Sequence, residues 1–115
     1  MYTTEIPIIS KLYELYKTFY QYIELFPKKD KYALGSACER YLTTTLELLL
    51  AAGSVPKNDK LNYLQQANVK FDALKFFIRL ARELKLLDSK KYLTLQTNIQ
   101  EIGRMLGGWQ RSLGQ

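Results

Sequence analysis

The chain has 115 residues, of which 47% are hydrophobic, 24% are charged and three are proline, a composition typical of one soluble globular domain. It contains no histidine, the commonest general base and transition-metal ligand, so we expect no catalytic residues, no metal site and no cofactor. The net charge of +6 lies in residues 57–115, which carry eleven Lys and Arg against five Asp and Glu, and this asymmetry favours an anionic partner.

Apolar residues recur every three or four positions in four segments, the spacing that places them on one face of an α-helix. The first predicted helix covers about residues 8–26 and ends at Pro27. Its apolar face comprises Ile9, Leu12, Tyr16, Phe19, Ile23 and Phe26. The second covers 31–53, and Gly53 is expected to end it in a left-handed conformation. Its face comprises Leu34, Cys38, Tyr41, Thr45, Leu48 and Ala52.

The third predicted helix covers 58–87, with Asn58 as its cap and Asp59 in its first turn. Its apolar residues form a band of two stripes with Phe76 beyond them: Leu64, Phe71, Leu74, Ile78 and Ala81, then Phe77, Leu80, Leu84 and Leu87. This band is wider than one bundle core needs, so part of it is expected to cover a second protein surface.

The fourth predicted helix covers 89–113, and its apolar residues alternate between intervals of four and three, as in a coiled coil. They are Leu95, Ile99, Ile102, Leu106, Trp109 and Leu113. Four helices joined by short loops predict an all-α, antiparallel up-down-up-down four-helix bundle, formed as a single domain by residues 1–115.

Three glycines and the single tryptophan interrupt the last helix, at Gly103, Gly107, Gly108 and Trp109. Glycine weakens a helix interior by roughly 1 kcal/mol relative to alanine, so these positions need a physical reason. Either the helix ends or bends here, or another backbone approaches so closely that no side chain fits. We assign the four residues to packing and assembly.

Basic residues form two predicted ridges. Lys75, Arg79 and Arg82 follow helical spacing on the third helix, and Arg104 and Arg111 are seven residues apart on the fourth. Both ridges are candidates for binding phosphates through charge-assisted hydrogen bonds. The plainer alternative is a solvated helical face on which residues such as Arg79 and Glu83 form ordinary surface ion pairs.

The sequence also bears on location. No apolar run approaches the roughly 20 residues needed to cross a bilayer, and the start, MYTTEIPII, lacks the pattern of a secretory signal. Cys38 is the only cysteine, lies on an apolar helical face and has no histidine to activate it, so we expect a small core residue. These features favour the cytoplasm and no membrane partner.

Three stretches carry a family resemblance: FPKKDKYALG at 26–35, RLARELKLLDSKKY at 79–92 and EIGRMLGGW at 101–109. With them the chain resembles the accessory variability determinant (Avd) proteins of diversity-generating retroelements. It also resembles the wider group of four-helix bundles that includes proteins encoded by intervening sequences of bacterial 23S ribosomal RNA genes. The resemblance covers nearly the whole chain.

The resemblance implies a homo-oligomeric barrel, a homopentamer with a basic surface, that binds the reverse transcriptase of the element and its template RNA or an RNA/DNA hybrid. It implies a non-enzymatic role in mutagenic retrohoming, without a small-molecule substrate. Two alternatives stay open at this point. One is a protein of the intervening-sequence type, and the other is a scaffold that binds only protein and whose basic residues serve solubility.

Overall fold

Four long helices pack side by side in the computed structural model, which describes residues 7–114. They are α2 (Pro7–Ile23), α4 (Ser36–Ser54), α5 (Lys57–Glu83) and α6 (Ser89–Ser112). The short helix α3 (Lys28–Asp30) and a π-helical turn, η1 (Lys31–Gly35), lead directly into α4. No strand occurs between residues 7 and 114, as the all-α prediction requires.

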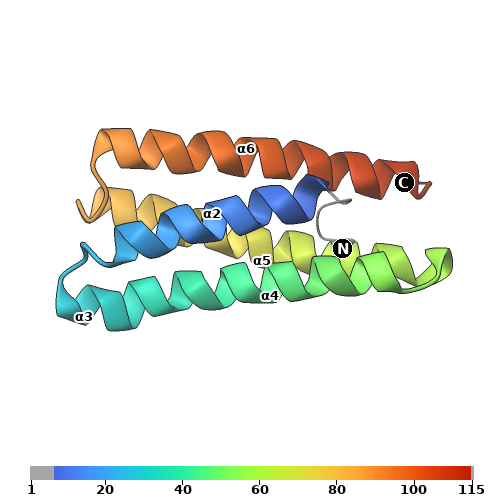
Figure 1. The fold of residues 1–115 in the computed structure, drawn as a ribbon, viewed down its shortest axis with the longest axis horizontal. Coiled ribbons are helices and arrows are strands. Elements are labelled where there is room, and N and C mark those ends of the chain that lie inside the picture. The colour runs from blue at the N-terminus through green and yellow to red at the C-terminus, as the bar shows by residue number, and fades with distance from the viewer. Residues whose placement is uncertain (1–6, 115) are drawn as a thin grey trace.

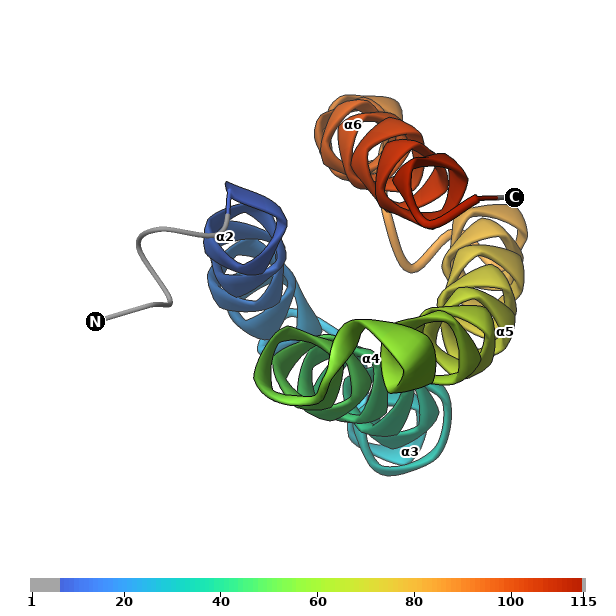
Figure 2. The same ribbon diagram turned by 90° about the vertical axis from the view of Figure 1, so that its right-hand side faces the viewer.

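The helices run alternately in opposite directions along the long axis of the molecule, and their order around the bundle is α2, α4, α5, α6 (Figures 1 and 2). Each helix therefore packs against the ones that precede and follow it in the chain, and α6 closes the ring against α2. Short connections between antiparallel neighbours produce this arrangement. The predicted up-down-up-down order agrees with the observed one.

The first helix ends three residues earlier than predicted. Pro7 occupies the first turn of α2, where its missing N–H is tolerated. After Ile23 the chain leaves the helix through a turn, in which Leu25 N donates to Tyr22 O at 3.0 Å and Phe26 N to Ile23 O at 2.9 Å. These bonds satisfy carbonyls at the helix end before Pro27 is reached.

The end of the second helix corrects a prediction about glycine. Gly53 lies inside α4 and does not adopt a left-handed conformation. The helix ends instead because Val55 precedes Pro56 and is extended, with φ −100° and ψ 162°. Lys60 Nζ donates to the carbonyl oxygen of Ala52 at 2.7 Å, which satisfies one of the last carbonyls of α4.

The bounds of the third helix also differ from the prediction. Lys57 begins α5 directly after Pro56, so Asn58 is not its cap, although Asp59 does lie in the first turn. The helix ends at Glu83 because Lys85 adopts a left-handed conformation, with φ 64°. Leu86 N then donates to Ala81 O at 2.9 Å, the long-range bond of a Schellman turn.

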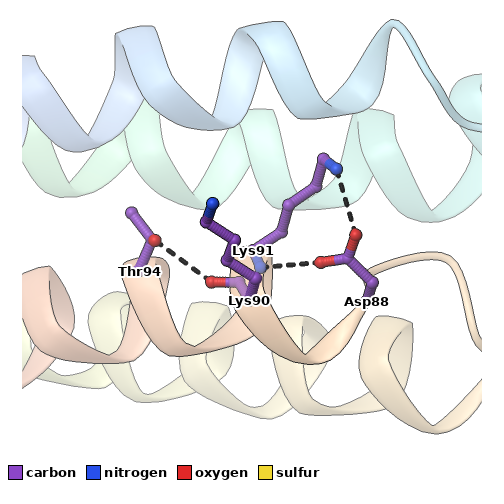
Figure 3. Close-up of polar contacts among 4 residues, drawn as sticks. All are labelled: Asp88, Lys90, Lys91 and Thr94. Carbon is purple, nitrogen blue, oxygen red and sulfur yellow. Dashed lines mark hydrogen bonds and ion pairs between the residues drawn. The ribbon is translucent and has the colours of Figure 1, made fainter.

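The last helix begins where predicted, and its start is capped. The carboxylate of Asp88 accepts a hydrogen bond from Lys91 N at 2.8 Å and forms an ion pair with Lys91 Nζ at 3.2 Å (Figure 3). The pKa of Asp88 is lowered from its ordinary value, mainly by the hydrogen bond from the Lys91 backbone N–H. The hydrogen bond from the Lys91 side chain lowers it further. In the same turn Thr94 Oγ1 donates to Lys90 O at 3.1 Å.

The core follows the predicted seams most closely on α5 and α6, where Leu64, Phe71, Leu74, Ile78, Leu95, Ile99, Ile102 and Leu106 are all buried. On α4 the buried face is rotated from the prediction: Leu42 and Leu49 are buried, whereas Tyr41 and Leu48 are only partly so. Thr45 is buried as expected, and its hydroxyl donates to Tyr41 O at 2.7 Å.

Candidate nucleic-acid interface

The ridge predicted on α5 is present but largely paired. Lys75 Nζ lies 2.9 Å from a carboxylate oxygen of Asp72, and Arg79 Nε lies 3.5 Å from one of Glu83. Arg82 turns toward the start of α6, where its Nη2 donates to Ser89 Oγ at 2.8 Å. Both ion pairs are exposed, so they stabilise little and leave the cations available to a competing phosphate.

The two arginines predicted on α6 lie in different environments. Arg104 is exposed, and no acidic group among residues 7–114 lies within 4.0 Å of its guanidinium nitrogens. Arg111 is also exposed, but its guanidinium lies beside Gly107 and Gly108. The second ridge is therefore not a single row of projecting cations.

A groove between α5 and α6 brings together members of the two predicted ridges. It has a volume of about 550 Å³ and contains both Lys75 and Arg104. The rest of its lining consists of three side-chain amides, two apolar residues and a glycine: Asn68, Gln96, Gln100, Phe71, Ile99 and Gly103. The amides could not be identified from the sequence, because isolated Asn and Gln residues carry no periodic signal.

Within one chain, the glycines of α6 neither end the helix nor allow another backbone to approach closely, the two roles expected from the sequence. The helix continues through all three to Ser112, and no other backbone lies within 4 Å of where their β-carbons would be. A β-carbon at Gly103 would meet no atom within 4 Å, and those at Gly107 and Gly108 would meet only Arg111. The glycine that is closely packed is Gly35, where a β-carbon would lie 3.2 Å from Ile23 Cγ2.

Trp109 is half-buried and packs against the edge of the core. Together with Pro7, Ile8 and Met105 it lines a shallow hollow of about 180 Å³ at one end of the α2–α6 interface. Part of its indole surface thus remains open in a single chain.

The outer face of α5 exposes a row of apolar side chains. Val69, Phe76 and Leu84 are 64%, 65% and 55% exposed, and the half-buried Ala73 and Leu80 lie between them at helical spacing. Phe76 and Leu80 line a hollow of about 270 Å³ with Arg79 and Glu83. The band on this helix is therefore wider than the core of one chain uses, as its sequence predicted.

One end of the bundle is basic, a feature that was not among those predicted from the sequence. The α2–α3 and α5–α6 connections lie together at this end, on the left in Figure 1. In or beside them lie exposed lysines that form no ion pair within the described residues, namely Lys28, Lys29, Lys85 and Lys90. The sequence signal was the clustering of lysines around the two turns.

The single cysteine is a core residue, as expected. Cys38 is buried on α4, and burial raises the pKa of its thiol to about 12, so the nucleophilic thiolate is suppressed at neutral pH. The pKa of Tyr16 is likewise raised, mainly by burial and to a lesser extent by the negative charge of the neighbouring Glu39. Neither group is poised as a nucleophile or base.

Two further observations concern the part of the chain that the structure describes. Its acidic and cysteine side chains do not gather anywhere into a group of three that could hold a metal ion. None of its helices has the length and apolar character that crossing a membrane requires.

The fold and the surface together define a small basic four-helix protein that presents an apolar face, a polar groove and a lysine-rich end. Residues 7–113 match the family model described as bAvd-like, and the chain belongs to this family. The resemblance to Avd proteins that the sequence suggested is thereby confirmed. No curated protein gives a significant match to the chain.

Proposed function

We propose that this chain is the non-enzymatic accessory protein of a diversity-generating retroelement, acting in the cytoplasm during mutagenic retrohoming. In this role it binds the reverse transcriptase of the element together with its template RNA or an RNA/DNA hybrid. The observation that carries the proposal is the match to the bAvd-like family over residues 7–113.

The basic surface supports the nucleic-acid part of the proposal. The net charge is +6, and the exposed cations include Lys75, Arg79 and Arg104 on the long helices and the lysines at the end of the bundle. Cations on several faces can contact phosphates of one extended RNA. Arg82, whose Nη2 donates to Ser89 Oγ, and Arg111, whose guanidinium lies beside Gly107, belong to the same basic surface.

The exposed face of α5 supports self-association, which we propose to yield a homopentameric barrel. Val69, Ala73, Phe76, Leu80 and Leu84 follow one another at intervals of four, three, four and four, a spacing that suits packing against another helix. Packing of this face in the assembly would remove the exposed apolar row from water. Gly103, Gly107, Gly108 and Trp109 are the other residues we assign to assembly.

Repetition in an oligomer would strengthen weak contacts. Each basic site occurs once per chain, so an RNA that spans several subunits engages many copies at a high effective concentration. A reverse transcriptase bound to the same assembly would then be held next to its template.

The test is RNA binding by the full chain at several salt concentrations, beside capture of the reverse transcriptase encoded by the same element. We expect affinity to fall with added salt, with a logarithmic slope of about −0.7 per phosphate contact on single strands. Arg79→Ala and Arg104→Ala should weaken binding for all sequences and make that slope shallower. Variants are compared only after light scattering shows an unchanged assembly.

Capture of the reverse transcriptase without salt-dependent RNA binding would instead identify a protein-only scaffold. Binding of neither partner would contradict the proposed function.

A further inference from the structure

The groove between α5 and α6 combines features that a solvated helical face does not need. Two cations, three amides and an open glycine line one concavity of about 550 Å³, a size within the range of small-ligand sites in proteins. We propose that this groove binds a single-stranded segment of RNA, with phosphates at the two cations and base edges against the three amides. This inference rests on the proposed function and locates its RNA-binding site in the α5–α6 groove.

The arrangement of the cations supports an extended strand. Helices α5 and α6 are antiparallel, so residues equally far from their connecting loop lie level with each other. Lys75 is therefore level with Gln96, and Arg104 with Asn68, at the opposite ends of the groove. From the helical rise of 1.5 Å per residue, the two levels are about 11 Å apart. A strand that runs along the groove can contact both cations.

The three amides of the groove match nucleobases. Asn68, Gln96 and Gln100 each offer a donor and an acceptor, the combination that base edges present. The Asn68 amide donates to Asp72 at 3.4 Å and that of Gln96 to Tyr92, so two of the three are held by neighbours.

The concave shape favours a single strand over a duplex. In A-form RNA the base edges of the major groove lie deep within a narrow cleft, and the phosphates surround a convex surface. Asn and Gln side chains on the α5 and α6 surface are too short to reach such edges. An unpaired nucleotide, with its base turned outward, can enter the concavity.

Gly103 keeps this groove open. A β-carbon there would meet no atom within 4 Å, so a larger side chain can occupy the groove without displacing the protein core. Gly103→Leu therefore fills the site from a position where the helix gains propensity rather than losing it. Loss of binding in this variant cannot be attributed to unfolding when its melting temperature is unchanged or higher.

The experiment measures fluorescence anisotropy of a labelled single-stranded RNA and of a duplex of the same sequence. Gly53→Leu is the matched control, because it makes the same exchange at an exposed helical position outside the groove. We expect the native chain to prefer the single strand, Gly103→Leu to bind it about tenfold more weakly or worse, and Gly53→Leu to bind normally. Melting curves and light scattering accompany each variant.

The outcomes separate this inference from the proposed function. Equal RNA affinity of the two leucine variants would overturn the groove assignment, while salt-dependent binding by the native chain would still support the proposed function. If Gly103→Leu lost the reverse transcriptase but kept RNA, the groove would be a protein site and the inference would be wrong. A native chain that bound no RNA would overturn both.

Discussion

The guanidinium of Arg111 lies beside Gly107, with Nη1 3.3 Å from the position that a β-carbon on Gly107 would occupy. The side chain thus reaches back along α6 by one helical turn, over backbone that a glycine leaves uncovered. This contact explains why Arg104 and Arg111, although seven residues apart on one helix, do not form a common ridge. It also ties two of the unusual residues of the last helix to each other.

The open position of Gly103 predicts that Gly103→Ala stabilises the protein. The added methyl group meets no neighbour within 4 Å and removes the helix penalty of glycine, a gain of about 0.5–1 kcal/mol in the free energy of unfolding. Urea unfolding monitored by circular dichroism measures the difference. A decrease in stability accompanied by a loss of assembly would show instead that another chain packs against this backbone.

The close packing around Gly35 predicts that a substitution there destabilises the protein. It is buried, and a β-carbon there would lie 3.2 Å from Ile23 Cγ2 and 3.4 Å from the carbonyl oxygen of Asp30. Gly35→Val places two further methyl groups in this contact and should lower the free energy of unfolding by about 1–3 kcal/mol. The same unfolding experiment tests it, and a variant as stable as the native chain would refute close packing at the α2–η1 contact.

Asp72 should act against RNA binding. Its carboxylate pairs with Lys75 at 2.9 Å and accepts from Asn68 at 3.4 Å, so it competes with a phosphate for one groove cation and repels it. Asp72→Asn is expected to tighten the binding of single-stranded RNA several-fold.

Asp59→Asn, which makes the same charge change in the first turn of α5, provides the control. Anisotropy titrations at constant salt compare the two variants. An equal gain in affinity from both would indicate a general effect of net charge rather than an effect at the groove.

The buried thiol of Cys38 predicts slow alkylation and a loss of stability in alkali. Folding raises the pKa of the thiol from 9.0 to about 12, so the unfolded chain releases its proton at lower pH than the folded chain does. The contribution of Cys38 to stability is therefore constant below about pH 9 and declines as the pH rises toward 12.

Mass spectrometry after iodoacetamide treatment should show slow labelling of the native chain and fast labelling in urea. Rapid labelling of the native chain at pH 8 would show that Cys38 is accessible.

The sequence predicts which segments are helical better than it predicts where each helix ends or how it aligns with the helices beside it. Leu95, Ile99, Ile102 and Leu106 are separated mostly by polar residues, so periodicity alone identifies the buried face of α6. On α4 the apolar residues are nearly continuous, as in LELLL at 46–50, and periodicity cannot choose between Leu48 and Leu49. The packing of α5 against α4 makes that choice.

Helix ends and the groove depend on information that local sequence does not carry. Lys85 adopts a left-handed conformation that usually indicates glycine, so the end of α5 had no conventional signal. The individual cations Lys75 and Arg104 could be predicted as surface residues. Their placement in one groove with Gln100 follows from how α5 and α6 align in space, which periodicity within each helix does not determine.

The connection between α5 and α6 is fixed at both ends: Leu86 N is bonded to Ala81 O, the Asp88 carboxylate to Lys91 N, and Arg82 to Ser89. Such a hairpin does not require a ligand to set the spacing of its arms. A molecule entering between α5 and α6 meets preorganised walls, so little backbone ordering opposes its association. Selectivity there would reside in the side chains, and exchanging Asn68, Gln96 or Gln100 would alter which bases are accepted without rebuilding the scaffold.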